Sequence, residues 1–118
     1  MIDESRPVYL RLRDEIAAAI LDGRYGDGEI LPSVRAFAAQ QGANPLTVAK
    51  AYQSFQDDGL IQVRRGVGMF VTPGASRRLR AMERERFFSS VWPGIAQQMH
   101  RIGITLEELA DRNDVPVA

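Results

Sequence analysis

The fold of this chain is decided by residues 44–59, NPLTVAKAYQSFQDDG, which have the pattern of a helix with a marked start and stop. Asn44 is a favoured residue just before a helix, and Pro45 suits the first helical position, where its missing N–H costs nothing. The apolar residues recur at the spacing of one buried helix face and are Val48, Ala51, Tyr52 and Phe55. Gly59 ends the pattern, so this stretch predicts one amphipathic helix.

A second, shorter helix is predicted directly upstream. Ser33 can cap its first turn after Pro32, and Gly42 stops it beyond about Gln41. Its apolar stripe consists of Val34, Phe37 and Ala38. The turn at residues 42–43 is short enough for the two helices to cross steeply, as they do in a helix-turn-helix.

Strand-like sequence follows directly after the helix at residues 44–59. Leu60–Val63 brings β-branched residues and loses the helical period, and Met69–Thr72 has a similar character. Gly66–Gly68 lies between these two runs, and Pro73–Gly74 follows them. Two short strands around a glycine-containing turn predict a β-hairpin.

The first helix is predicted over Pro7–Leu21, with Gly23 just past its end. Its apolar face consists of Val8, Leu12, Ile16, Ala19 and Ile20. Helix, short helix, tight turn, helix and hairpin follow one another in the order of a winged helix-turn-helix. We therefore expect a mainly α fold with a small β-hairpin, whose winged helix-turn-helix domain spans residues 1–72.

The remainder, residues 73–118, is predicted to form C-terminal helices. A periodic apolar face begins after Ser76, Pro93 must kink or split the helix near Trp92, and Gly103 ends it. Thr105–Glu108 has the spacing of a capping box and opens a last short helix. We expect this segment to serve dimerisation and to carry any effector site.

Charge is distributed unevenly along the chain, although its net charge is zero. Residues 44–86 carry eight basic and four acidic residues, whereas the flanking parts are each net negative. A basic centre is the electrostatic footprint of a nucleic-acid-binding domain. A normally solvated surface would have the same composition, so charge alone leaves both interpretations open.

Several function classes are disfavoured by the composition. The chain has no cysteine, which excludes a disulfide scaffold, a thiolate zinc site and a cysteine nucleophile, and His100 is the single histidine. We expect no cofactor, no metal and no enzyme, because the carboxylate pairs at residues 57–58 and 107–108 suit local roles at helix ends. The start is not a signal peptide and no stretch is apolar enough to span a membrane, so we expect a cytoplasmic, nucleoid-associated protein.

Five stretches together resemble the GntR-type bacterial regulators in order and spacing. They are Pro7–Tyr9, Leu31–Arg35, Asn44–Val48 with Ala51–Tyr52, Gly59–Ile61 and Arg65–Val71. The short C-terminal part is similar to the YtrA-type branch of that family. The resemblance implies a transcriptional regulator, expected to be a repressor, that binds a palindromic operator as a homodimer and controls a transporter operon.

The residues expected to contact DNA come from both helices and the wing. A buried Val48 stripe turns Leu46, Lys50, Gln53 and Asp57 outward. Lys50 could reach a guanine or a phosphate, while Leu46 either touches a thymine methyl or is one ordinary exposed leucine. The full predicted set is Ser33, Arg35, Asn44, Leu46, Thr47, Lys50, Arg64, Arg65 and Gly66.

Different grounds support the members of this set. Ser33 and Thr47 lie near helix N-termini, which favour phosphates, and the residues from Arg64 to Gly66 suit a wing tip. For Arg35 the family resemblance implies a DNA contact. The chain departs from many family members, which carry arginines where Pro45 and Ala49 stand here, so their operator preference does not transfer.

The C-terminal segment carries more large apolar side chains than one face of a kinked helix can bury. We expect a homodimer interface made of Leu79, Phe87, Phe88, Val91, Trp92, Ile95 and Met99. A small-molecule effector of unknown identity would bind at an interface, because this segment is too small to enclose a cavity. The rival interpretation is a winged helix that binds proteins, and salt-dependent binding to duplex DNA separates the two.

Overall fold

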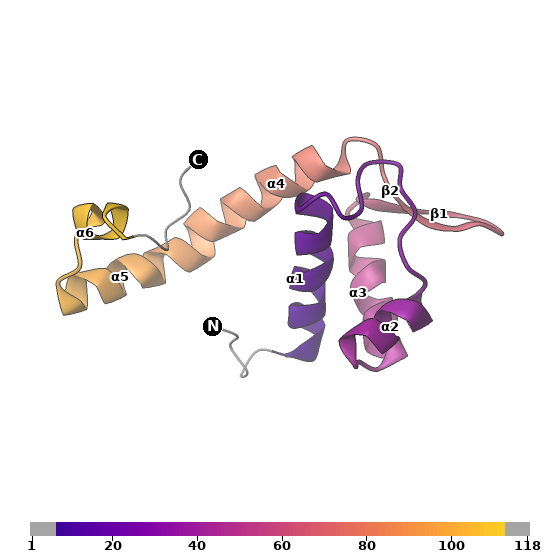
Figure 1. Cartoon of the computed structure of the whole chain (residues 1–118), viewed down its shortest axis with the longest axis horizontal. Helices are drawn as coiled ribbons and strands as arrows, with labels where there is room; N and C mark the ends of the chain where they lie inside the picture. The colour runs from indigo at the N-terminus through magenta and orange to yellow at the C-terminus, as the bar shows by residue number, and fades with distance from the viewer. Residues whose placement is uncertain (1–6, 113–118) are drawn as a thin grey trace. The chain divides into compact units, whose positions relative to one another are not determined.

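The computed structural model describes residues 7–112. The chain divides into two compact units, Met1–Ala81 and Met82–Ala118. The first contains α1 (Val8–Leu21), α2 (Val34–Gln41), α3 (Pro45–Asp57), β1 (Ile61–Arg64), β2 (Gly68–Val71) and the start of α4 (Ala75–Arg86) (Figure 1). The second contains the rest of α4, a π-helical turn η1 (Phe87–Val91), α5 (Trp92–Ile102) and α6 (Leu106–Ala110). The expected mainly α fold with one hairpin is confirmed.

The core of the first unit lies between α1, α3 and the hairpin. Tyr52 and Phe55 are its largest fully buried side chains, and Figure 1 shows α1 running beside α3. Helices α1 and α3 supply half of the buried apolar cluster, with Leu12, Ile16, Ala17, Ile20, Val48, Ala51, Tyr52 and Phe55. The predicted buried stripe of α3 is therefore the face that fixes this helix in the unit.

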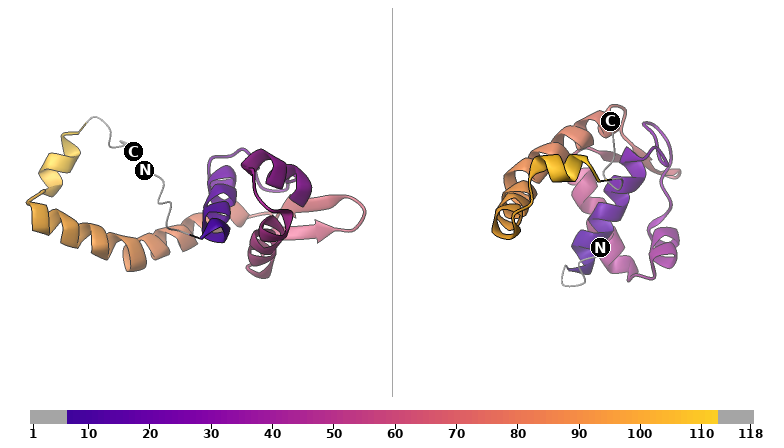
Figure 2. Two further views of the ribbon diagram at one scale, coloured as in Figure 1. Left: turned by 90° about the horizontal axis from the view of Figure 1, so that it is seen from below. Right: turned by 60° about the vertical axis from the view of Figure 1, so that its left-hand side comes forward.

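The hairpin pairs β1 with β2 in antiparallel register, with Ile61 opposite Val71 and Arg64 opposite Gly68. Residues 28–31 run along the other edge of β2, where Leu31 N–H donates to the Met69 carbonyl at 2.8 Å. Figure 2 shows the tip of the hairpin extending past the helices of this unit. The wing is thus held at its base, by α3 and by the chain that leads into α2.

The start of α4 belongs to the first unit. The Asp27 carboxylate accepts hydrogen bonds from Gly74 N–H at 2.8 Å and Ser76 N–H at 3.2 Å. Arg78 donates to the carbonyls that end α3, at Asp58 (2.7 Å) and Gly59 (3.3 Å). The first unit therefore continues through residue 81 and includes a predicted member of the tail.

Leu79 corrects the sequence prediction of the dimer interface. Its side chain is only 1% exposed and lies in the apolar core of the first unit. A residue already buried inside one chain cannot pack against a partner. The periodicity of residues 79–99 did not reveal this, because one helix, α4, contributes to both units.

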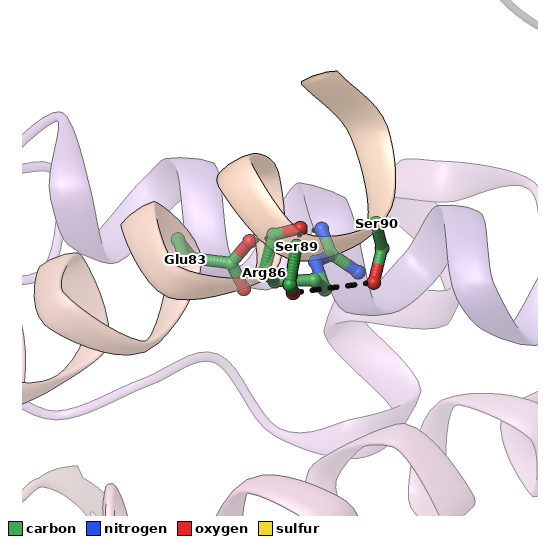
Figure 3. Close-up of polar contacts among 4 residues, drawn as sticks. All are labelled: Glu83, Arg86, Ser89 and Ser90. Atoms are coloured by element: carbon green, nitrogen blue, oxygen red, sulfur yellow. Dashed lines mark hydrogen bonds and ion pairs between the residues drawn. The ribbon is translucent and has the colours of Figure 1, made fainter. Parts of the chain in front are cut away.

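The interruption expected near Trp92 takes the form of the π-helical turn η1. Trp92 N–H donates to the Phe87 carbonyl five residues back, whereas an α-helix would use the fourth. Around this turn Arg86 pairs with Glu83 at 2.8 Å, and the hydroxyls of Ser89 and Ser90 lie 3.4 Å apart (Figure 3). Thr105 caps α6 by accepting from Glu108 N–H at 3.2 Å, as the capping box predicted.

No helix between residues 7 and 112 is both long and apolar enough to cross a bilayer.

Candidate nucleic-acid interface

Helices α2 and α3 form the predicted helix-turn-helix. Gly42 adopts a left-handed φ of 61°, which glycine tolerates without strain, and Ala43 N–H donates to the Ala38 carbonyl at 2.9 Å. Tyr52 on α3 donates its hydroxyl to the Pro32 carbonyl at 2.8 Å. These contacts fix the crossing of the two helices and leave both N-termini at the surface.

The start of α2 presents two of the predicted residues. Ser33 is exposed and its hydroxyl accepts from Ala36 N–H at 3.1 Å, so its cap role is confirmed. Arg35 is exposed, and its guanidinium makes no ion pair with any residue that the structure describes. An unpaired cation in the first turn of a helix is available for a phosphate or a base edge.

The start of α3 carries three more of the predicted DNA contacts. Asn44 accepts from Leu46 N–H at 2.8 Å through its side-chain oxygen, which leaves its amide nitrogen as a donor toward solvent. Leu46 is 80% exposed, while Thr47 is half-buried. This end of the helix has no acidic residue in its first turn, so an anion can approach it without repulsion.

Lys50 lies at the edge of the exposed face of α3, on the side of α1. Its Nζ stands 5.0 Å from the ring centroid of Tyr9, and the ring is half-buried against the core. A cation over an aromatic face is attracted by the ring quadrupole, which restricts where the ammonium can reach. Sequence reasoning placed Lys50 on the outer face correctly but did not find Tyr9 beneath it.

The wing tip is formed by Arg65 and Gly66 between the strands. Gly66 has a left-handed φ of 77°, and Val67 N–H closes the turn onto the Arg64 carbonyl at 3.0 Å. The Arg64 guanidinium lies over the Phe70 ring at 4.4 Å, while Arg65 projects into solvent. Of the two arginines, Arg65 is therefore the one with free reach.

A cleft of about 430 Å³ lies between the start of α2 and the hairpin. It brings Ser33 together with Arg64, Arg65 and Gly66, which are far apart in the sequence. Its other lining residues are Ile30, Leu31, Pro32, Val34, Val63, Val67, Gly68 and Met69. The other predicted contacts, which are Arg35 on α2 and the four residues Asn44, Leu46, Thr47 and Lys50 on α3, do not line this cleft.

Two residues that position predicted cations, Phe70 and Tyr9, are not predicted by patterns within single elements. Phe70 shares a hairpin face with Arg64 and is its diagonal neighbour across the strands, so the predicted register could have revealed it. Tyr9 and Lys50 are separated by too much chain for any local spacing to link them. Their contact depends on the packing of α1 against α3.

The second unit holds the other predicted interface residues. Phe87, Phe88, Val91 and Ile95 are exposed, whereas Trp92 and Met99 are half-buried. Phe87 and Phe88 pack edge to face with their ring centroids 5.3 Å apart. Between residues 7 and 112 no three His, Cys, Asp or Glu side chains lie close enough together to hold a metal ion.

Comparison with known proteins identifies relatives over most of the chain. Residues 8–71 match the family described as bacterial regulatory proteins, gntR family. The HTH-type transcriptional regulator YhcF of Bacillus subtilis is 31% identical over 91% of this chain and 87% of its own length. The HTH-type transcriptional repressor YtrA of Bacillus subtilis is 36% identical, and the matched part covers 64% of this chain and 58% of that relative.

Solved structures of transcriptional regulators superpose on this chain. A GntR family transcriptional regulator from Listeria monocytogenes superposes with a TM-score of 0.72 at 27% identity, over 92% of this chain and 94% of its own. The DNA-binding domain of AraR, solved in complex with operator ORX1, superposes with a TM-score of 0.55 at 25% identity, over 61% of this chain and 87% of its own.

Proposed function

Since the chain belongs to the gntR family of bacterial regulatory proteins, and is thereby a DNA-binding transcriptional regulator, we propose that it acts as a homodimeric repressor on a palindromic operator. In this proposal the first unit reads DNA and the helices of the second unit join two chains. The relatives are transcriptional regulators rather than enzymes.

One observation supports the proposed mode of DNA binding. The first unit carries the exposed N-termini of α2 and α3 together with a wing whose Arg65 is exposed. Arg35 is unpaired among the described residues, and Arg65 at the wing tip is exposed. A recognition helix meets base edges with its N-terminal residues. We therefore assign base contacts to α2 and α3, and backbone contacts to the wing.

The homodimer is supported by the apolar side chains that the second unit leaves in solvent. Phe88 is 57% exposed, and Val91 and Ile95 are also exposed. One recognition helix reads only a few base pairs, so two copies related by a two-fold axis gain both affinity and specificity. A two-fold interface would cover the same apolar patch on each chain.

Repression is proposed because the relative YtrA is a repressor. An operator that overlaps a promoter would let the bound dimer block transcription. We extend the proposal to a transporter operon as the regulated target, on family resemblance alone. A reporter gene placed behind an operator selected by the protein from a random pool should be silent when the protein is present and expressed when it is absent.

DNA binding is tested by measuring affinity for a duplex selected from a random pool, at several salt concentrations. Affinity should fall steeply as salt rises, because phosphate contacts release counterions. The Arg35→Ala variant should lose about 1–3 kcal/mol on the selected duplex if it reads a base. The Arg65→Ala variant should weaken binding to every duplex and flatten the salt dependence.

A matched control is Arg101→Ala, which removes an exposed arginine from α5 in the second unit. This variant should bind the selected duplex like the parent protein. Unchanged affinity in an Arg35→Ala, Lys50→Ala double variant would refute the assignment of the reading face. Absence of any salt-dependent duplex binding would favour a winged helix that binds proteins.

A further inference from the structure

The outer face of the first two turns of α3 is apolar at its centre. Leu46 is 80% exposed, the largest exposed fraction among the large apolar side chains of the described residues, and Ala49 beside it is also exposed. The acidic residues of this region, Asp57 and Asp58, lie at the opposite end of the helix. DNA can therefore approach the N-terminal half of α3 without charge repulsion, and that half presents a leucine.

Three polar side chains on the outer face of α3 already have partners within the chain. Asn44 uses its side-chain oxygen to cap α3, and Lys50 holds its ammonium over Tyr9 at the edge of the face. Gln53 donates its amide to Asp57 at 2.9 Å. The free amide nitrogen of Asn44 lies at the start of the helix and Thr47 is half-buried, so the most exposed side chain on this face is the leucine.

Chemistry then selects the base that such a side chain can recognise. The major groove presents hydrogen-bond donors and acceptors on every base pair, and its one apolar group is the 5-methyl of thymine. Resting on the proposed function, we propose that Leu46 determines specificity by packing against a thymine methyl group in each half-site. A leucine against a donor or acceptor edge would instead leave that edge without its water, which disfavours other bases.

The experiment uses the full chain and a duplex selected by it from a random pool. Each thymine of the duplex is replaced in turn by deoxyuridine, which removes the methyl group and keeps every hydrogen-bonding group. At one position in each half-site the parent protein should lose affinity roughly three- to fivefold, as expected for one buried methyl group. At the other thymines the affinity should stay unchanged.

The Leu46→Ala variant should bind the thymine and deoxyuridine duplexes equally well. The Gln53→Ala variant, changed on the same helix face about two turns further on, should keep the parent's preference for thymine. Because Leu46 and Gln53 are both exposed and outside the core, both variants should melt near the parent's temperature. The readout is a ratio of two affinities within one variant, so a general loss of binding does not imitate it.

Two outcomes overturn the inference while leaving the proposed function intact. One is a parent protein that binds the selected duplex but shows no sensitivity to any thymine methyl. The other is a Leu46→Ala variant that keeps the parent's ratio between thymine and deoxyuridine. If no duplex is bound at any salt concentration, the proposed function fails and the role of Leu46 fails with it.

Discussion

Tyr52 joins the two helices of the helix-turn-helix through one side chain. Its ring is buried in the core and packs on Phe37 with centroids 5.8 Å apart, and its hydroxyl donates to the Pro32 carbonyl at 2.8 Å. Burial raises the pKa of its phenol well above the ordinary value, with repulsion from Tyr25 as a smaller cause. Tyr52 therefore stabilises the packing of α2 against α3 only while its hydroxyl is protonated.

Replacing Tyr52 by Phe should cost about 1 kcal/mol of unfolding free energy at pH 7, because the Pro32 carbonyl loses its donor. The phenol ionises near pH 10 in the unfolded chain but at higher pH in the folded one. The stabilisation that the Tyr52 phenol contributes is thus fully present below pH 10 and is lost as the pH rises further. The Tyr52→Phe variant has no phenol at this position and shows no such loss. Urea titrations from pH 7 to 11 should show the difference between the two proteins shrinking.

Tyr9→Phe is the matched control for this measurement. The Tyr9 hydroxyl makes no hydrogen bond with the described residues, so this variant should be nearly as stable as the parent at pH 7. A gap between the parent and Tyr52→Phe that stays constant up to pH 11 would contradict the account.

Among the elements, α4 depends most on a residue far away in the sequence. Asp27 sits in the loop after α1 and accepts from two N–H groups at the start of α4. These hydrogen bonds, first the one from Ser76 and then the one from Gly74, hold the pKa of the Asp27 carboxyl below its ordinary value. An ionised carboxylate also complements the positive N-terminal end of the helix dipole.

Replacing Asp27 by Asn should lower the melting temperature at pH 7. A depressed pKa means that the carboxylate contributes stability above the unfolded pKa near 3.9, and that this contribution is lost as the pH falls through the lower folded value. The melting temperatures of parent and variant should therefore converge as the pH drops toward 2. Asp22→Asn, at the exposed end of α1, is the control and should change little at either pH.

The π-helical turn has a physical cause in Pro93, the second residue after it. Pro93 has no N–H to donate, and its ring would clash with the carbonyl four residues back, at Ser89. The helix widens over residues 87–91, so that Trp92 N–H bonds to the Phe87 carbonyl instead. One extra residue in a turn rotates the side chains after it relative to those before it. The apolar side chains of α5 therefore face in a direction that a regular helix would not give them.

At the scale of the whole molecule, the two units differ in how much they bury. The first has a closed apolar core, while no side chain of η1, α5 or α6 is buried. A helix that exposes a continuous apolar face in water calls for a partner. In the proposed function a second copy of the chain is that partner, and the dimer interface sets the spacing of the two DNA-binding units.

A Phe88→Ser, Ile95→Ser double variant should abolish the proposed dimer. The full-length parent should sediment near twice the 13.1 kDa mass of one chain, and the variant near that mass itself. Both substituted side chains are exposed within one chain, so the monomeric variant should keep its helical content. Leu46→Ala, which also removes an exposed apolar side chain but from the first unit, should remain dimeric. Monomeric parent protein at micromolar concentration would contradict the prediction.

Patterns within single helices predict the main local features of the helix-turn-helix. The caps at Ser33 and Asn44, the buried stripe of α3 and the outward position of Leu46 all follow from signals within a few residues, because helix starts and helix faces are set by near neighbours. Three other features appear only in the folded chain: Leu79 belongs to the core, Asp27 caps α4, and Tyr9 lies under Lys50. Each of these pairs residues from elements far apart in the chain, and no local period reports which elements pack together.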